Sequence, residues 1–287
     1  MKNMANKRAV CGVIGNPIGH TLSPLIHDTL AAHMGQALDY VPFLVESAHL
    51  EEAIKGARAL NIKGLNVTMP HKKEVMEYVE ALDEMAKKVG AVNTLVSTET
   101  GYKGYNTDAM GLRMALECHH LDYENKNVAI IGSGGAAYAS VVSVMDKAKS
   151  VHVFNRTKAN AQLLKEHFEE QDYNKIEVYS EEELPKVPID YVIQTTGVGM
   201  GKLENQIPKC AGTLLKTAKI AVDLIYNPDE TCFLKEAKEK GCLTLNGFDM
   251  LFYQAVLAYE LMHHCTLERT SLENIKRDII NQLEQMK

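Results

Sequence analysis

Polar side chains crowd into four short stretches before residue 110. The stretches are GNPIGHTLSP, NVTMPHKK, GAVNTL and YNTD, and the second of them carries Lys72. Asn, Thr, Ser and Asp favour turns and helix caps on local grounds alone, so any one stretch is adequately explained as a turn. All four stand at or beside the ends of strand-like runs, which is where open α/β sheets bind ligands. Together they predict a substrate site.

A glycine-rich turn predicts a second site, for a dinucleotide. The run NVAIIGSGGAAYASVVSVM reads as an apolar strand, a turn and a helix, which is the context that the dinucleotide fingerprint requires. Gly132 suits the tight turn, Gly134 suits the close approach of a pyrophosphate, and the small Ala137 stands at the third glycine position. Glycine-rich turns also serve as plain corners, so the flanking strand and helix carry the prediction. The predicted cofactor-binding loop comprises Gly132, Ser133, Gly134, Gly135 and Ala136.

The end of the next strand-like run bears on which dinucleotide binds. The run VHVFNRT ends in Asn155, Arg156 and Thr157, whereas an NAD site usually places Asp or Glu there to hold the ribose 2′-hydroxyl. A guanidinium pairs well with a phosphate, and no carboxylate stands there to repel one. NADP is therefore favoured over NAD, although Arg156 could instead be an ordinary solvated arginine.

Strand-like and helix-like runs alternate along the chain, which predicts an α/β fold with mostly parallel sheets. The first series contains the strands RAVCGVIG, YVPFLV and KGLNVTM, a polar helix HKKEVMEYVE, and a hairpin AVNTLVSTETGYKGYNTD. The second contains the strands NVAIIG, VHVFNR, DYVIQTTG, KIAVDLIY and CLTLNG. Two amphipathic helices end the chain. We predict two domains: an N-terminal α/β substrate-binding and catalytic domain over residues 1-115, completed by residues 248-287, and a Rossmann-type dinucleotide-binding domain over residues 116-247.

Composition narrows the class of partner to a small molecule. The chain has 287 residues, enough for two domains, and a formal net charge of −6, which disfavours nucleic acid and anionic membranes. The 6 cysteines form no C-x-x-C pair, so neither a disulfide framework nor a metal site is expected. No stretch approaches the roughly 18 consecutive apolar residues of a membrane span. These features favour a cytoplasmic protein.

The motifs taken together resemble those of the shikimate and quinate dehydrogenases. The matching pieces are GNPIGHTLSPLIHD, NVTMPHK, GAVNTL, GYNTD, IGSGGAA, FNRT, DLIYNP and NGFDMLFYQA, in the order of that family and over nearly the whole chain. The resemblance implies reversible reduction of 3-dehydroshikimate to shikimate by NADPH, in the route to aromatic amino acids. It also implies that Lys72 and Asp108 form the catalytic pair. Lys72 would stabilise and protonate the developing alkoxide, and Asp108 would orient it.

The resemblance assigns the remaining polar residues to binding. Thr21, Ser23 and Tyr226 would hold the substrate carboxylate through their hydroxyls. A second group would read the hydroxyl pattern of the substrate: Asn66, Thr68, Asn93 and Gln254. Gly247 is predicted to join the cofactor site. His20 and His27 lie near the carboxylate-binding stretch, where a structural role is as plausible as a contact with substrate.

Three departures from the family pattern leave alternatives open. Thr21 replaces a serine, and Ala109 replaces the glycine after the catalytic aspartate. Asn160 stands where many NADP-dependent members have a second arginine, so Lys158 would have to supply a charge and NAD use stays open. Quinate stays open as a substrate, as does a homodimer as the oligomeric state. A non-catalytic metabolite sensor is the alternative from another class, and the presence of both Lys72 and Asp108 speaks against it.

Overall fold

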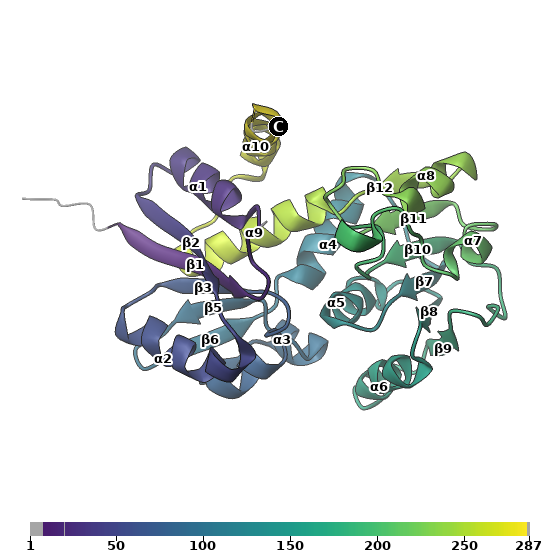
Figure 1. The fold of residues 1–287 in the computed structure, drawn as a ribbon, viewed down its shortest axis with the longest axis horizontal. Coiled ribbons are helices and arrows are strands. Elements are labelled where there is room, and N and C mark those ends of the chain that lie inside the picture. Colours follow the sequence, from purple (N-terminus) through teal and green to yellow (C-terminus); the bar gives the residue numbers. More distant parts are fainter. Residues whose placement is uncertain (1–7, 20, 286–287) are drawn as a thin grey trace, which may run out of the picture. The chain divides into compact units, whose positions relative to one another are not determined.

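The computed structural model describes residues 8–19 and 21–285 (Figure 1). The chain divides into two compact units: the first comprises Met1–Thr107 and Gln254–Lys287, and the second comprises Asp108–Tyr253. Each unit is built on a six-stranded sheet. The predicted α/β fold, with the C-terminal helices returning to the first unit, is confirmed. The assignment of residues 1-115 with 248-287 to substrate, and of 116-247 to cofactor, stays a prediction.

The sheet of the first unit is mixed, in the order β2-β1-β3-β5-β6-β4. Its strands are β1 (Ala9–Gly15), β2 (Leu38–Leu44), β3 (Gly64–Val67), β4 (Ala81–Leu82), β5 (Thr94–Ser97) and β6 (Tyr102–Tyr105). β1 pairs in parallel with β2 and β3, whereas β5 runs antiparallel to β3 and to β6. The predicted hairpin is therefore confirmed as β5 and β6. Because β5 is reversed, its first residues lie at the carboxyl ends of β3 and β6, where the predicted substrate residues also lie.

Helices cover this sheet and close its core. They are α1 (Ser23–His33), α2 (Leu50–Ala59) and α3 (Glu84–Val89), with the short 3₁₀ helices η1 (Ser47–His49) and η2 (Glu74–Tyr78). The buried face of α2 carries Leu50, Ile54 and Ala57. These side chains belong to one core cluster with β-strand residues such as Leu65 and Leu95, as expected for an amphipathic helix on a sheet. The carboxylate of Asp83 caps α3 by accepting a hydrogen bond from the Ala86 N–H at 2.7 Å.

The C-terminal helices are α9 (Phe248–His263) and α10 (Leu272–Gln285), with η4 (Arg269–Ser271) between them. α10 lies beside α1 (Figure 1). His33 Nε2 lies 2.8 Å from Asp278 Oδ2, and the Gln282 side chain donates to the Thr29 hydroxyl at 3.2 Å. The end of the chain thus packs on the helix that begins at Ser23.

The predicted polar helix over HKKEVMEYVE is wrong in part. The segment forms only the short η2, after which Val79 is extended and β4 begins. The Glu80 N–H bonds the Tyr102 carbonyl at 2.9 Å, and the Asp83 N–H bonds the Gly104 carbonyl at 2.9 Å. Pairing with β6 therefore supplies the backbone bonds that a longer helix would otherwise have made.

The sheet of the second unit is wholly parallel, in the order β12-β11-β10-β7-β8-β9. Its strands are β7 (Asn127–Ile131), β8 (Ser150–Asn155), β9 (Ile176–Ser180), β10 (Tyr191–Gln194), β11 (Ile220–Asp223) and β12 (Leu243–Leu245). β9 is absent from the predicted series. Only Ile176 and Tyr179 of its residues IEVYS are buried, and the other three are partly exposed, as befits an edge strand rather than the apolar central strands.

The helices of this unit are α4 (Asp108–Cys118), α5 (Gly135–Val144), α6 (Lys158–Glu169), α7 (Ala211–Leu214) and α8 (Cys232–Glu239), with the short η3 (Gly201–Leu203). Figure 1 shows α5 and α6 on one side of the sheet and α7 and α8 on the other. The sheet residues Ala129 and Ile131 share one core cluster with Leu214 and Phe233 of the latter helices. Burial on both faces explains why the central strands are continuous apolar runs.

Candidate active site

The loop that carries Lys72 is fixed on both sides by backbone hydrogen bonds. The Lys72 carbonyl accepts from the Val92 N–H at 2.7 Å, and the Met69 carbonyl accepts from the Asn16 N–H at 3.0 Å. The preceding His71 is fully buried, and its Nε2 lies 2.8 Å from the Val45 carbonyl oxygen. Lys72 itself is half-buried. Its backbone is therefore held at the carboxyl end of β3, while Lys73 beside it is exposed.

Two buried amides lie next to this loop. Asn66 of β3 accepts a hydrogen bond from the Tyr40 hydroxyl at 2.7 Å, and it donates to the Asn93 carbonyl at 3.2 Å and to the Thr94 hydroxyl at 3.1 Å. Both amide hydrogens of Asn66 are thus engaged, and its remaining capacity is a second lone pair on Oδ1. In this arrangement Asn66 would accept, rather than donate, a hydrogen bond from a ligand hydroxyl.

Asn93 ties three segments together. Its Nδ2 donates to the Thr107 hydroxyl at 2.8 Å and to Gln254 Oε1 at 3.3 Å, and its Oδ1 accepts from the Thr107 N–H at 2.8 Å. Gln254 comes from α9, more than a hundred residues further along the chain. Asn66, Asn93 and Gln254 are therefore brought together, as the sequence predicts. Asp108 follows Thr107 directly, begins α4 and is buried.

Thr21 and Ser23 lie at the start of α1. The Thr21 hydroxyl donates to the Ser23 hydroxyl at 3.1 Å and accepts from the Ser23 N–H at 3.2 Å. Thr68, by contrast, is held through its backbone, because its N–H bonds the Ile14 carbonyl at 2.9 Å. His20 lies outside the described residues.

Tyr40 and His27 are structural partners in this region: the sequence leaves the role of His27 open and does not single out Tyr40. Their rings stack with centroids 4.1 Å apart. Burial, reinforced by the nearby His263, lowers the pKa of His27 to about 3, so the ring is neutral at physiological pH. Burial raises the pKa of Tyr40 well above its ordinary value, opposed in part by the Ser23 hydroxyl. The phenol therefore stays protonated and donates to Asn66. A buried tyrosine needs a partner for its hydroxyl, but the sequence does not say which.

Tyr226 belongs to the second unit, in the loop after β11. Burial raises the pKa of its phenol. The base of this loop is closed by the buried Asp223, which accepts from the Thr231 hydroxyl at 2.6 Å and from the Ile225 N–H at 3.0 Å. Asp223 therefore fixes the segment that carries Tyr226.

The buried carboxyl of Asp223 makes stability depend on pH. Burial raises its pKa to about 6, against the opposing hydrogen bonds from Thr231 and Ile225. A carboxyl whose pKa is higher in the folded chain stabilises the fold fully below its unfolded-state pKa, and this contribution is lost as the pH rises through the folded-state value. Between about pH 4 and pH 7, the free energy of unfolding should fall by up to about 3 kcal/mol relative to Asp223→Asn. Urea unfolding of both proteins across this range measures the difference; a difference that is constant with pH would contradict the prediction.

The glycine-rich loop has the backbone that a dinucleotide turn requires. Gly132 has a φ of 117°, which favours glycine, and a Cβ there would collide with the Thr195 hydroxyl. Gly134 is exposed and precedes α5, and a Cβ there would meet nothing within 4 Å. Ala137 is fully buried, as expected at the third position of the fingerprint. Open space at Gly134 beside the helix N-terminus fits an approaching pyrophosphate.

The remaining members of the predicted cofactor site lie on the same unit. Ser133, Gly135 and Ala136 are half-buried in the loop and first turn of α5. Gly247 is buried, and a Cβ there would collide with the Leu224 carbonyl, so close packing by itself explains this glycine. Whether it also contacts a cofactor stays a prediction.

The end of β8 fits a 2′-phosphate better than a free ribose. Asn155 folds its amide back onto the Thr157 carbonyl at 2.8 Å, which closes the turn. Arg156 is exposed, and it forms no hydrogen bond or ion pair within residues 8–19 and 21–285. Lys158 opens α6 and is paired with Glu183. No carboxylate stands at the strand end itself, so the residues present fit NADP.

A dinucleotide turn on a parallel sheet, together with a polar cluster at the strand ends of a second sheet, defines a two-unit α/β dehydrogenase. Residues 13–95 match the family profile of the shikimate dehydrogenase substrate binding domain, and residues 113–208 match that of shikimate / quinate 5-dehydrogenase. The chain is 40% identical over 277 residues to shikimate dehydrogenase (NADP(+)) of Bacillus cereus strain B4264, covering 95% of this chain and 98% of that one. The chain belongs to the shikimate dehydrogenase family.

Solved structures agree with this assignment. One is a shikimate dehydrogenase in complex with NADP+, with a TM-score of 0.87 and 35% identity over 96% of each chain. Another is shikimate 5-dehydrogenase from Listeria monocytogenes in complex with shikimate and NAD, with a TM-score of 0.85 and 30% identity over 97% of this chain and 99% of that one. Across the residues that the structure describes, no helix is long and apolar enough to span a membrane.

Proposed function

We propose that this chain catalyses the reversible, NADP-dependent interconversion of shikimate and 3-dehydroshikimate. The observation that carries the proposal is the network of the buried Asn66 and Asn93 with the half-buried Gln254, beside the fixed Lys72 loop. Buried polar groups are costly unless they are satisfied, and these satisfy one another at the sheet edge where α/β folds bind ligands. The naming of similar proteins as NADP(+)-dependent shikimate dehydrogenases supports the same reaction.

Lys72 is the proposed proton donor. During reduction the substrate carbonyl oxygen gains negative charge, and an ammonium within hydrogen-bond reach stabilises this charge and delivers a proton. Backbone hydrogen bonds join Lys72 to Val92 and Met69 to Asn16. They limit the positions that the Lys72 side chain can take, and a catalytic group must be held in the right geometry to be effective. Asp108 is the proposed partner on the same hydroxyl: its carboxylate accepts hydrogen bonds and orients the ammonium. When bound, NADPH supplies the hydride.

The other polar residues are proposed to select the substrate. Asn66 would accept a hydrogen bond from a ring hydroxyl through the free lone pair of Oδ1, and Thr68, Asn93 and Gln254 would contact neighbouring hydroxyls. Side-chain hydroxyls suit the substrate carboxylate because each can donate one hydrogen bond to it. We assign the binding of this carboxylate to Thr21, Ser23 and Tyr226. A site built to pair several hydroxyls rejects analogues that lack one.

The reduced cysteines support a cytoplasmic location. None of the six, all of which lie within the described residues, forms a disulfide, and three of them, Cys11, Cys210 and Cys242, are buried. Proteins of oxidising compartments commonly pair their cysteines. We therefore place the reaction in the cytoplasm.

Initial rates of cofactor reduction test the proposed reaction. Shikimate and quinate would each be combined with NADP and with NAD at matched concentrations. We expect the highest kcat/KM for shikimate with NADP. Comparable rates with quinate would move the chain to the dual-specificity branch of the family, and absence of turnover with every pair would contradict the proposal.

A further inference from the structure

An acidic segment lies beside the strand end that is expected to meet the 2′-phosphate. β8 and β9 pair in parallel, and their register places Asn155 opposite Ser180. The two strands therefore end together. After β8 the chain continues as Arg156, Thr157 and Lys158, and after β9 it continues as Glu181, Glu182 and Glu183. The sheet thus brings a basic and an acidic segment to the same edge.

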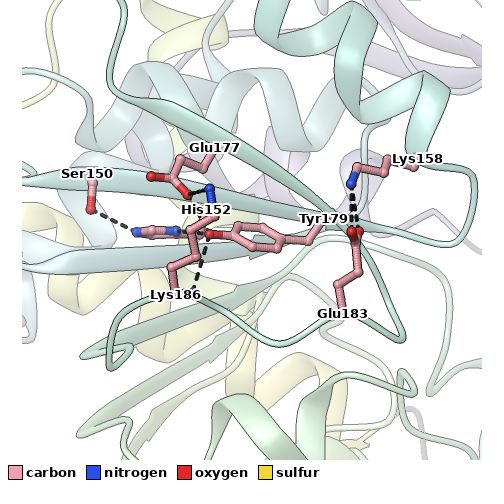
Figure 2. A network of polar contacts seen from close by, with 7 residues as sticks. All are labelled: Ser150, His152, Lys158, Glu177, Tyr179, Glu183 and Lys186. Atoms are coloured by element: carbon pink, nitrogen blue, oxygen red, sulfur yellow. Dashed lines mark hydrogen bonds and ion pairs between the residues drawn. The ribbon is translucent and has the colours of Figure 1, made fainter.

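Glu183 and Lys158 form the contact between these segments. Lys158 Nζ lies 2.7 Å from Glu183 Oε1 and 2.8 Å from Oε2 (Figure 2). The Ser180 N–H donates to Glu183 Oε2 at 2.5 Å, so the carboxylate is also held by the end of β9. The hydrogen bond from Lys158, followed by that from Ser180, lowers the pKa of Glu183. Glu183 therefore carries a negative charge at neutral pH.

The two cations at the strand end, Arg156 and Lys158, differ in their contacts. Arg156 makes no hydrogen bond or ion pair with any residue that the structure describes, whereas both oxygens of Glu183 hold Lys158. Asn160 occupies the position one turn further along and carries no charge. Arg156 is thus the one cation at this strand end whose charge is not already neutralised by a neighbouring carboxylate among the described residues.

We propose that Glu183 sets the cofactor preference of this chain by holding Lys158 away from the 2′-phosphate of NADP. The carboxylate neutralises the lysine and also repels the phosphate, and both effects lower the affinity for NADP while leaving NAD, which has a 2′-hydroxyl, almost unaffected. Glu183 thereby weakens the preference for NADP that the sequence predicts. This inference rests on the use of NADP proposed above. It adds Glu183, which lies outside the glycine-rich loop and the Asn155–Thr157 turn, to the residues that control the choice between NADP and NAD.

Equilibrium binding tests the role of Glu183 without depending on turnover. Titration calorimetry would measure the dissociation constants of NADP and NAD for the wild type, Glu183→Gln, Lys158→Gln and the double variant, at low ionic strength. Glu183→Gln should bind NADP about two- to fivefold more tightly, the range expected for one exposed ion pair, with NAD unchanged. Lys158→Gln alone should weaken NADP binding by at most about twofold, because it leaves the Glu183 carboxylate without its cation, and in the Glu183→Gln background it should remove the part of the gain that the released lysine supplies.

A neighbouring glutamate provides the matched control. Glu182 lies in the same segment and faces Lys209 at 3.6 Å, so Glu182→Gln removes the same charge without releasing Lys158. The proposal is wrong if Glu182→Gln tightens NADP binding as much as Glu183→Gln, if Glu183→Gln has no effect, or if Lys158→Gln alone weakens NADP binding severalfold. A wild type that binds neither dinucleotide would instead contradict the use of NADP itself.

Discussion

Replacement of Lys72 by methionine is expected to lower kcat by about 10²–10⁴-fold, with substrate affinity changed far less. Methionine keeps most of the length of the side chain but has neither the charge nor the proton. The ammonium is required chiefly when the carbonyl oxygen becomes an alkoxide, so its loss affects the transition state more than the ground state. Stopped-flow and steady-state rates with shikimate and NADP give kcat, and calorimetry gives shikimate binding.

Lys73 supplies the matched control for this variant. It is adjacent in sequence, and it is exposed where Lys72 is half-buried. Lys73→Met should keep kcat within about twofold of the wild type, as usual for surface substitutions. An unchanged rate in Lys72→Met would remove the lysine from the mechanism, and a comparable loss in Lys73→Met would point to disturbance of the loop instead.

Replacement of Asp108 by asparagine is expected to lower kcat/KM for shikimate by about 10²–10³-fold. Asparagine is nearly isosteric, and it keeps one oxygen acceptor but loses the charge that orients the ammonium and strengthens the hydrogen bond accepted from the hydroxyl. Asp108 is buried at the start of α4, directly after the Thr107 that Asn93 holds. The backbone should therefore stay in place, and the loss should report the carboxylate itself.

The control for Asp108 is an aspartate remote in sequence whose partner is known. Asp278 of α10 contacts His33 and is about half exposed, so Asp278→Asn makes the same chemical change at a surface histidine–aspartate contact. We expect its kcat/KM to stay within about twofold of the wild type. Asp108→Asn with wild-type kcat/KM would contradict the assignment, and equal unfolding midpoints of the two variants would exclude a loss through instability.

The sequence predicts most of the fold because local and global signals agree. The central strands of the second unit are continuous apolar runs, and the turn at Gly132 needs a backbone that glycine favours. The hairpin of β5 and β6 is marked by a polar turn with Gly101. Such elements can be predicted from the sequence because periodicity, turn residues and burial agree.

The elements that the sequence does not predict depend on partners far away in the chain. β9 is an edge strand in which three of the five residues are partly exposed, so its pattern is weak. Ala81 and Leu82, directly after HKKEVMEYVE, form β4 only because β6 offers backbone partners. Local propensity does not contain this information, because tertiary pairing overrides it.

The candidate site shows the same limit at the level of side chains. The motif positions Asn66, Asn93 and Gln254 are joined as the sequence predicts. The hydroxyl of Tyr40 that orients Asn66, and the carboxylate of Glu183 that holds Lys158, lie outside the motifs. Each acts through a contact between strands or segments 25 or more residues apart, which spacing alone does not indicate.

The most direct test of the proposed mechanism is kcat/KM for shikimate in the double variant Lys72→Met, Asp108→Asn. If the two side chains act as a unit on one hydroxyl, the double variant should be only a few-fold slower than the slower single variant, because the second loss removes an interaction that is already broken. Losses that multiply in full would show that Lys72 and Asp108 act independently, and would contradict their assignment as one acid–base pair.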